Sequence, residues 1–415
     1  MALSSCISYH EAPVNLTQDT EEWATVSAAV CKDKRLNCEQ MIKTGLLLNR
    51  ELNHARLKLA KSTCVAEFAG LWSDPAIACE VERVFGENIT NNALAPSLTL
   101  PVTGLPALAE KIAEQYKEAD YWKMRQTERR YMAELECLRF RILVSEAKWK
   151  STQDRLAVIQ EEQKRISKLC EQGEIGLASF QIAVQRLNDA RRAEKKLRTE
   201  HLNLLNTLIE KLGLHPSVGS IELTGSLPKG VPTAASMPSP EELLNAPSLL
   251  ALQAEYGASE SELKAEIRKQ YPELGITPSF GRDGGYNQAS IGFSIPLPLW
   301  NRNRGSIAKA SGDRELKQAE LITGWRHLVQ QAALGYSAQN MLRQQCLEEL
   351  AGFNELEKNA SRQERLFNLG ETSILTLAET RHAAYEQHLS YLSILENLLI
   401  SRCNLQYLNP HFNQK

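Results

Sequence analysis

Cysteine and histidine, the side chains that most often bind metals or act as nucleophiles, occur nine and eight times in the chain. No two cysteines form a CxxC pair and the histidines are scattered, so no zinc or redox motif is present. Nucleophile elbows, Walker A loops, HExxH helices and Rossmann fingerprints are also absent. The glycine-rich GRDGG at 281–285 lacks the following helix that a phosphate loop needs and is typical of a hairpin loop. We predict a protein that is not an enzyme and uses no cofactor or metal.

The cysteines leave two states open. Eight remain when Cys6 is set aside, and these could pair in an oxidising compartment, although we expect free, partly buried thiols on helices. The stretch from Leu3 to Cys6, LSSC, is similar to the end of a lipoprotein signal peptide, which would make Cys6 a lipid anchor. This interpretation assumes an upstream segment, because the first residues lack the basic and apolar regions of a secretory signal. The alternative is an exposed N-terminal thiol.

The stretch 291–305, IGFSIPLPLWNRNRG, predicts a strand that turns sharply into a long helix. Proline cannot donate a hydrogen bond to a sheet, so the strand must end at Pro296. A weaker echo, SLTLPV, ends at Pro101. Asparagine caps helices, arginine anchors at interfaces, and tryptophan is typical of a membrane-interface belt. The predicted strand-to-helix junction therefore comprises Pro101, Pro296, Pro298, Trp300, Asn301, Arg302, Asn303, Arg304 and Gly305.

The charge balance and composition exclude several classes of protein. With 48 basic and 50 acidic residues, the chain has no excess charge that would indicate a nucleic-acid partner. The sequence contains no run of about 18 or more apolar residues, so hydropathy gives no candidate transmembrane helix. Alanine, leucine, glutamate, glutamine, lysine and arginine dominate, which favours helix. The fold class is therefore mainly α with a small β part.

An internal duplication organises the sequence. Pro75 and Pro272 are 197 residues apart, as are Gly173 and Gly370, while Pro101 and Pro296 are 195 apart. An offset that survives across a linker indicates two copies of one unit. The predicted domains are an N-terminal extension, a first repeat, a Pro/Gly/Ser-rich linker, a second repeat and a C-terminal tail, at residues 1–34, 35–215, 216–240, 241–408 and 409–415.

Each repeat is expected to contain a helix, two strands, a very long helix, a glycine turn and a last helix. The long helix of the first repeat would span roughly 100 Å and needs a partner along its whole length. The two shorter helices, stacked end to end, would supply it. We expect helices at 37–72, 105–172, 178–212, 240–270, 304–369 and 371–408, with strands at 77–82, 97–102, 273–282 and 289–296.

Several stretches resemble the TolC-type outer membrane factors, also called outer membrane efflux proteins. They are SIPLPLWNRNRG, preceded by YPELGITPSFG; the turn RLFNLGETSILTLAETR; and LNCEQMIKTGLLLNRELNHARLKLAK, followed by AGLWSDP. The N-terminal stretch from Cys6 to Pro13 also resembles this family. The PLPLWNRNRG signature is most similar to the CzcC/CusC-like heavy-metal efflux branch.

This resemblance implies a TolC-like homotrimer, in which three chains build an α-helical barrel and a 12-stranded transmembrane β-barrel. It implies a bacterial outer-membrane location, with most of the chain in the periplasm. Glu80, Glu82 and Arg83 in the first predicted strand lead us to expect a weak lipid-facing band. The partners would be outer-membrane lipid, a periplasmic adaptor (membrane fusion protein) and an inner-membrane transporter, and no nucleic acid.

The two glycine turns are the candidate docking site. Without the resemblance they are helix reversals with glycine in the left-handed conformation. With it, they form the adaptor-docking and gating tip. Glu174 and Glu371 would then form acidic rings that favour cations, or they remain solvated turn carboxylates. The candidate tip residues are Gly173, Glu174, Ile175, Gly176, Arg365, Leu366, Phe367, Gly370, Glu371, Thr372 and Ser373.

The predicted function is a passive outer-membrane exit duct of a tripartite (RND-type) efflux system that exports metal cations or small toxic compounds. Two alternatives stay open. One is a type I protein secretion duct, and the other is a long coiled-coil scaffold protein without a pore.

Overall fold

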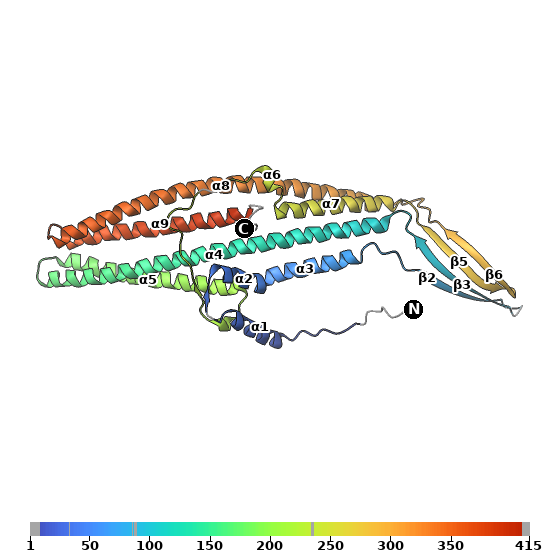
Figure 1. The fold of residues 1–415 in the computed structure, drawn as a ribbon, viewed down its shortest axis with the longest axis horizontal. Helices are drawn as coiled ribbons and strands as arrows, with labels where there is room; N and C mark the ends of the chain where they lie inside the picture. Colours follow the sequence, from blue (N-terminus) through green and yellow to red (C-terminus); the bar gives the residue numbers. More distant parts are fainter. Residues whose placement is uncertain (1–8, 33, 85, 87–88, 234–235, 409–415) are drawn as a thin grey trace. The chain divides into compact units, whose positions relative to one another are not determined.

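A computed structural model describes residues 9–32, 34–84, 86, 89–233 and 236–408 of the chain. Cys6 and the predicted tail 409–415 lie outside these residues. Figure 1 follows the elements along the chain. They are α1 (Leu16–Val30), β1 (Arg35–Leu36), α2 (Cys38–Leu48), α3 (Arg50–Glu67), β2 (Ala76–Val84), β3 (Ile89–Leu100), α4 (Leu105–Glu171), α5 (Leu177–Leu212), the 3-10 turn Pro216–Val218, β4 (Glu222–Leu223), α6 (Pro240–Leu243), α7 (Pro247–Arg268), β5 (Leu274–Asp283), β6 (Tyr286–Ser294), α8 (Arg304–Asn368) and α9 (Ile374–Leu408).

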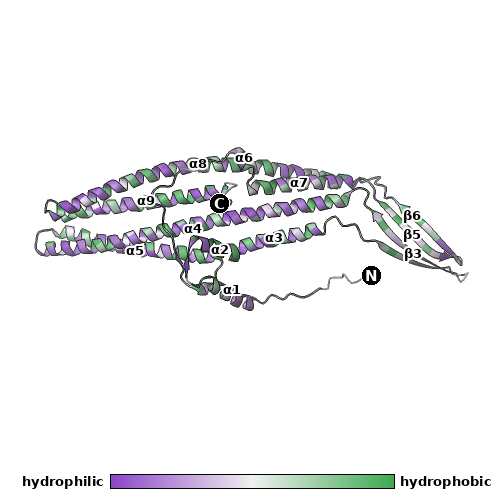
Figure 2. Ribbon diagram, viewed as in Figure 1, coloured by the Kyte–Doolittle hydropathy of each residue, from purple (hydrophilic) through white to green (hydrophobic). Residues whose placement is uncertain are grey.

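The mainly helical fold class and the repeated order of elements are confirmed. The two very long helices, α4 and α8, contain 67 and 65 residues and begin within a residue of their predicted starts. α5 and α9 run back from them, as predicted (Figure 1). Figure 2 shows hydrophilic and hydrophobic residues alternating along each of these helices, the pattern of a helix that is partly buried.

The chain divides into two compact units, and each unit takes segments from both repeats. One contains the described parts of Met1–Asn53, Arg130–Met237 and Leu334–Tyr407, and we call it the hairpin unit because it holds both glycine turns. The other, which we call the sheet unit, contains the described parts of His54–Arg129 and Pro238–Ala333 together with Leu408. The predicted division into repeats at 216–240 stays a prediction, since these units follow spatial contacts and not sequence order.

Two predicted helices are each interrupted. The helix expected at 37–72 breaks at Asn49, whose extended backbone (ψ 123°) ends α2 and whose side-chain oxygen accepts a hydrogen bond from the Leu52 amide at the start of α3. The helix expected at 240–270 breaks before Pro247, which takes the first position of α7 because it has no amide hydrogen to donate. Asn37 caps α2 in a capping box with Gln40.

β2, β3 and β6 are longer than predicted, β5 has the predicted length, and one helix was not predicted. β3 begins at Ile89 and not at Ser97, so its 12 residues include Pro96. β2, β5 and β6 contain 9, 10 and 9 residues. The helix α1 was missed because residues 16–30 lack a clear apolar period. Its Trp23 indole nitrogen donates to the Gly213 carbonyl at 2.7 Å, which attaches α1 to the end of α5.

The hairpin unit has continuous apolar cores. One gathers buried side chains from α2, α4 and α5 around the parallel pair β1–β4, which aligns Arg35 with Glu222 and Leu36 with Leu223. A second core joins α4, α8 and α9. Representative members of the two cores, all below 2% exposed, are Met41, Leu135, Leu208 and Ile221 in the first, and Val144, Cys346 and Leu395 in the second.

The helices of the sheet unit pack through small side chains. Ala251, Ala254 and Ala258 of α7 are buried, and the Ser261 hydroxyl donates to Gln115 of α4 at 2.7 Å. Lys317 of α8 reaches Glu255 of α7 at 2.8 Å. Small residues allow the helix backbones to approach closely, and the charged pairs fix which helix turns meet.

Candidate functional site

Both glycine turns have the same hydrogen bonds. In the first, the amides of Glu174 and Gly173 donate to the carbonyls of Leu169 and Cys170 at 2.9 and 3.1 Å. In the second, the equivalent amides of Glu371 and Gly370 donate to Leu366 and Phe367, both at 3.0 Å. Gly173 and Gly370 have φ of +76° and +78°, which glycine adopts without strain. Each turn is therefore a Schellman C-cap, and the shared pattern confirms the duplication.

The turns differ in how the next helix is capped. Ser373 accepts a hydrogen bond from the Thr376 amide at 3.2 Å through its side-chain oxygen. The equivalent position before α5 is Gly176, which has no side chain to make this bond. Glu174 and Glu371 are exposed at the tips. Behind them, Ile166, Ala183 and Ile374 are buried in one apolar cluster with partly buried Ile175 and Phe367, so the two turns pack together.

Replacing the serine cap tests this difference. Ser373→Ala is expected to destabilise the second turn by about 1 kcal/mol, because the Thr376 amide loses its acceptor. Gly176→Ser is expected to stabilise the first turn by a few tenths of a kcal/mol, since nothing lies within 4 Å of its added Cβ. Thermal unfolding of the two purified variants measures both effects. Equal stability of Ser373→Ala and the wild type would contradict the cap.

A buried ionic cluster joins the two hairpins behind the tips. The carboxylate of Glu162 in α4 lies 3.5 Å from Arg155 of the same helix and 3.1 Å from Arg381 of α9. Arg381 also reaches Glu364 of α8 at 2.9 Å, and Arg155 donates to the Ala378 carbonyl at 3.3 Å. Arg155 and Glu162 are 8% and 9% exposed. Burial lowers the pKa of the Arg155 guanidinium, and Glu162 opposes that change.

Further polar contacts continue this cluster along α4 and α9. Thr152 and Tyr385 share a hydrogen bond of 2.8 Å, and Ser151 lies 3.1 Å from the His388 ring. Lys148 donates to Glu396 at 3.1 Å. We call these contacts, with the ionic cluster, the α4–α9 polar seam. Burial lowers the pKa of His388, which keeps the imidazole neutral in the seam.

The α4–α9 polar seam was not predicted from the sequence. Its α4 members recur at helical spacing, which places them on one face, but any solvent-exposed face of a helix shows the same spacing. Beside the seam lies a groove of about 340 Å³ between α4, α5 and α9. Its lining includes both charges and apolar side chains, among them Arg155, Ile159, Arg186, Tyr385 and Leu389.

The predicted strand-to-helix junction residues follow the ends of β3 and β6. Pro101 comes directly after β3, and Pro296 and Pro298 follow β6, so the strands end as the prolines require. Trp300 is 89% exposed. Asn303 has φ of +53°, and its amide donates to the Glu266 carbonyl at 2.8 Å and to its carboxylate at 2.7 Å. Asn303 therefore anchors α8 to α7 and is not a side-chain cap. Asn301, Arg302, Arg304 and Gly305 occupy the turn and the first residues of α8.

The four long strands form one antiparallel sheet in the order β2-β3-β5-β6. Tight turns at Gly284 and Gly285, with φ of +57° and +93°, close the β5–β6 hairpin that GRDGG predicted. Pro96 and Pro278 lie opposite each other in the β3–β5 register, where the ladder is interrupted between Leu94 and Leu98. Proline has no amide hydrogen, so neither residue can donate at this point of the ladder.

The two faces of this sheet differ sharply in polarity. Because paired residues share a face, the register places one apolar set across all four strands. Glu80 and Glu82 belong to the opposite, polar face, so they do not interrupt the apolar one, whereas Arg83 lies on the apolar face beyond Val81, next to the turn. The expectation of a weak apolar band is therefore wrong for the two glutamates and stays a prediction for Arg83. The apolar face contains Ile77, Cys79, Val81, Leu94, Leu98, Ile276, Phe280, Ile291 and Phe293.

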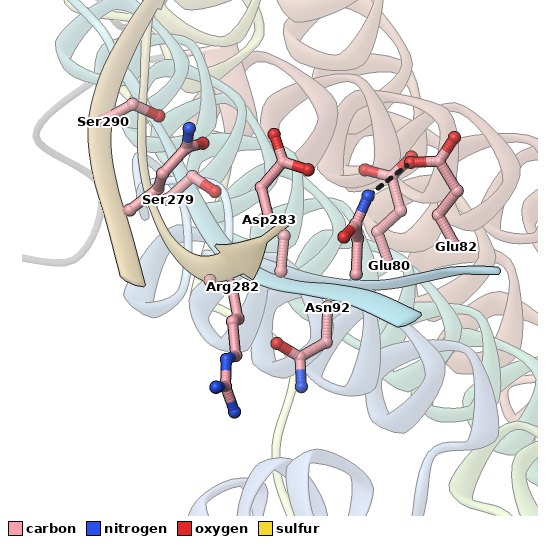
Figure 3. A pocket seen from close by; sticks show the side chains of 11 residues that line it. Glu80, Glu82, Asn92, Ser279, Arg282, Asp283 and Ser290 are labelled. Carbon is pink, nitrogen blue, oxygen red and sulfur yellow. Dashed lines mark hydrogen bonds between the residues drawn. The ribbon is translucent and has the colours of Figure 1, made fainter. Parts of the chain in front are cut away.

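A shallow pocket of about 190 Å³ lies on the polar face. Figure 3 shows Glu80, Glu82 and Asp283 projecting from one side of the strands, with Arg282 and Asn92 on the other. Asn91 donates to Glu82 at 3.4 Å. Within the described ranges, no group of three or more His, Cys, Asp or Glu side chains is placed to hold a metal ion.

Hydropathy along the described helices gives one further result. None of them is both long enough and apolar enough to cross a membrane. In the structure, the eight described cysteines form no disulfide bond with one another.

Comparisons with known proteins agree with this architecture. Residues 239–408 match the family described as outer membrane efflux protein. A 93-residue stretch is 34% identical to the cobalt-zinc-cadmium resistance protein CzcC of Cupriavidus metallidurans, a match that covers 21% of this chain and 22% of CzcC. The sequence similarity to that relative therefore spans about a fifth of its length.

Solved structures match over nearly the whole chain. A crystal structure of CusC has a TM-score of 0.76 at 15% identity and covers 90% of this chain and 92% of its own. The outer membrane protein VceC of Vibrio cholerae has a TM-score of 0.75 at 14% identity, with 90% and 96% covered. At these identities the likeness shows the fold. The chain has the fold of these outer membrane proteins, and the resemblance to outer membrane factors is confirmed.

Proposed function

We propose that this protein is the outer-membrane exit channel of a tripartite efflux system. The observation that carries the proposal is the two-faced sheet, whose apolar face suits contact with lipid and whose polar face suits contact with a water-filled lumen. Its strands of 9 to 12 residues are long enough for this role, because a spanning strand needs about 9–11 residues. The family match of residues 239–408 and the fold of the whole chain support it.

The strand order explains why copies of the chain are needed. β2 and β6 are the edge strands of the described sheet, and exposed edges are not tolerated in lipid. Neighbouring strands alternate in direction, so β6 of one copy and β2 of the next would also run antiparallel. An even number of strands per chain therefore lets three copies close a ring of twelve strands without a parallel pair.

The glycine turns would dock the periplasmic adaptor and form the gate. Their exposed Glu174 and Glu371 would meet the partner or the solute first. The groove beside the α4–α9 polar seam offers the adaptor a mixed charged and apolar surface. Docking there would compete with the seam, and the helices would then move apart like an iris. The energy for export would come from the inner-membrane transporter, and this chain would serve as a passive channel.

Membrane location and copy number test the channel directly. Fractionation is expected to place the protein in outer membranes, and chemical crosslinking in those membranes is expected to give a trimer. A monomer or dimer in the cytosolic fraction would contradict the proposal and favour a scaffold protein.

Metal cations are the proposed substrates, and the 93-residue similarity to CzcC supports this class. Deleting the gene is expected to lower tolerance to zinc, cobalt, cadmium, copper or nickel salts, with recovery when the gene is returned on a plasmid. Growth at graded metal concentrations measures the effect. Unchanged tolerance to all of them, together with loss of a secreted protein, would instead favour a secretion duct.

A further inference from the structure

Cys137 of α4 and Cys403 of α9 lie beside each other in the hairpin unit. The Cys137 sulfur is 3.8 Å from the Ile400 carbonyl oxygen and 3.6 Å from the Asn404 side-chain oxygen. The Cys403 sulfur is in turn 3.8 Å from the carboxylate of Glu136. Each thiol therefore contacts the helical turn that carries the other thiol.

Burial shields both of these cysteines from solvent. Cys137 is 9% exposed and Cys403 is 1% exposed. The neighbouring Cys403 thiol lowers the pKa of Cys137. The same contact, burial and the nearby Glu136 raise the pKa of Cys403. These opposite shifts follow from the closeness of the two sulfurs in the folded protein.

We propose that Cys137 and Cys403 form a disulfide bond in the mature protein. The inference rests on the proposed outer-membrane function, because disulfides form and persist outside the inner membrane and are rare in the cytosol. The Cys137 thiolate attacks one sulfur of an oxidised dithiol oxidoreductase and makes a mixed disulfide. The Cys403 thiolate, after losing its proton, then attacks Cys137. The new S–S bond forms as the oxidoreductase leaves as a dithiol with both protons and both electrons.

The bond would fasten the end of α9 to α4. The cysteines are 266 positions apart, so the crosslink would enclose most of the second repeat and would remove much conformational freedom from the unfolded chain. Because both thiols are buried, the exchange must occur before α9 packs onto α4. It would then hold the helices of the two repeats together at a point separate from the polar seam contacts described above.

Peptide mapping of protein from purified outer membranes tests the bond. Free thiols are first blocked with N-ethylmaleimide in denaturant, and the unreduced digest is examined by mass spectrometry. We expect a Cys137–Cys403 peptide pair that separates after reduction. Cys346 of α8 is a matched control, because it is also fully buried. Cys137→Ser should remove the pair, whereas Cys346→Ser should keep it.

Thermal unfolding gives a second readout on the wild-type protein itself. Adding a reductant is expected to lower its midpoint by about 2–5 °C and to leave the midpoint of Cys137→Ser unchanged. If N-ethylmaleimide labels both cysteines in protein from outer membranes, the disulfide proposal is wrong, whereas the channel proposal is unaffected. If the protein is absent from outer membranes, the channel proposal fails. Refolding the purified chain with oxidised glutathione then decides the pairing, and the absence of a Cys137–Cys403 link would overturn it.

Discussion

Glu162→Gln is expected to destabilise the protein by about 3–5 kcal/mol, because removing one partner of a buried ion pair leaves uncompensated charge. The two guanidiniums of Arg155 and Arg381 now share this carboxylate at 3.5 and 3.1 Å. A neutral amide cannot balance both, and Arg155 has little access to solvent. Chemical denaturation of the purified, detergent-solubilised protein measures the loss.

The neighbouring carboxylate provides the control. Glu161 is exposed and pairs only with Lys164 on the same helix, at 2.8 Å. Glu161→Gln is expected to unfold at the wild-type denaturant concentration, since exposed pairs of this kind contribute little. If both variants unfolded alike, the buried cluster would not be a special source of stability.

The same variant also has a functional readout. If the α4–α9 polar seam holds the proposed gate closed, cells carrying Glu162→Gln should admit a large hydrophilic antibiotic that intact outer membranes exclude. Loss of stability with no increase in entry would mean that the cluster stabilises the hairpins but does not control the opening. The wild type and Glu161→Gln should both exclude the antibiotic.

Ile291→Lys is expected to prevent assembly in the outer membrane, whereas Ser290→Lys should be tolerated. The two residues are neighbours in β6 and lie on opposite faces of the sheet. A lysine on the lipid-facing side of a spanning strand costs about 2–4 kcal/mol near the middle of the bilayer, and a trimer would contain three. A lysine on the polar face would meet water. Both substitutions add the same charge to the same exposed strand, so only the face differs.

Immunoblots of outer-membrane fractions measure the difference between these two variants. We expect strong loss of Ile291→Lys and near wild-type amounts of Ser290→Lys. Equal recovery would show that the apolar face does not contact lipid, and loss of both would show that β6 tolerates no charge at all. Either outcome would contradict the proposed orientation of the sheet.

Much of this fold could be predicted from the sequence because its signals are local and repeated. Proline and glycine mark the ends of α4 and α8. Because the landmarks recur 197 residues apart, the elements predicted in one repeat can be compared with those predicted in the other. The break at Asn49 was missed because the apolar spacing of three and four residues continues across it, and only its hydrogen bonds to neighbouring elements reveal it. The first half of β3 was missed because Asn91 and Asn92 are typical of turns.

The candidate site was predicted less completely. The tips follow from glycine, whose backbone freedom is a local property, and the structure places both turns as equivalent caps. The α4–α9 polar seam depends on residues more than 200 positions apart, such as Thr152 and Tyr385, which no local pattern connects. Likewise, Glu80 could be assigned to one face of the sheet only after the register of β2 and β3 was known.

The register of the sheet also records how the two repeats diverged after duplication. The offset is 197 at the first proline and at the glycine turn but 195 at the end of the second strand of each repeat, so two residues separate the copies around the strands. A strand repeats every two residues, and an even change therefore leaves every later side chain on its original face. An odd change within β6 would turn the residues after it over and exchange the faces of Ile291 and Ser290. A change of one residue within a strand would therefore disrupt the two-faced sheet, whereas a change of two would preserve it.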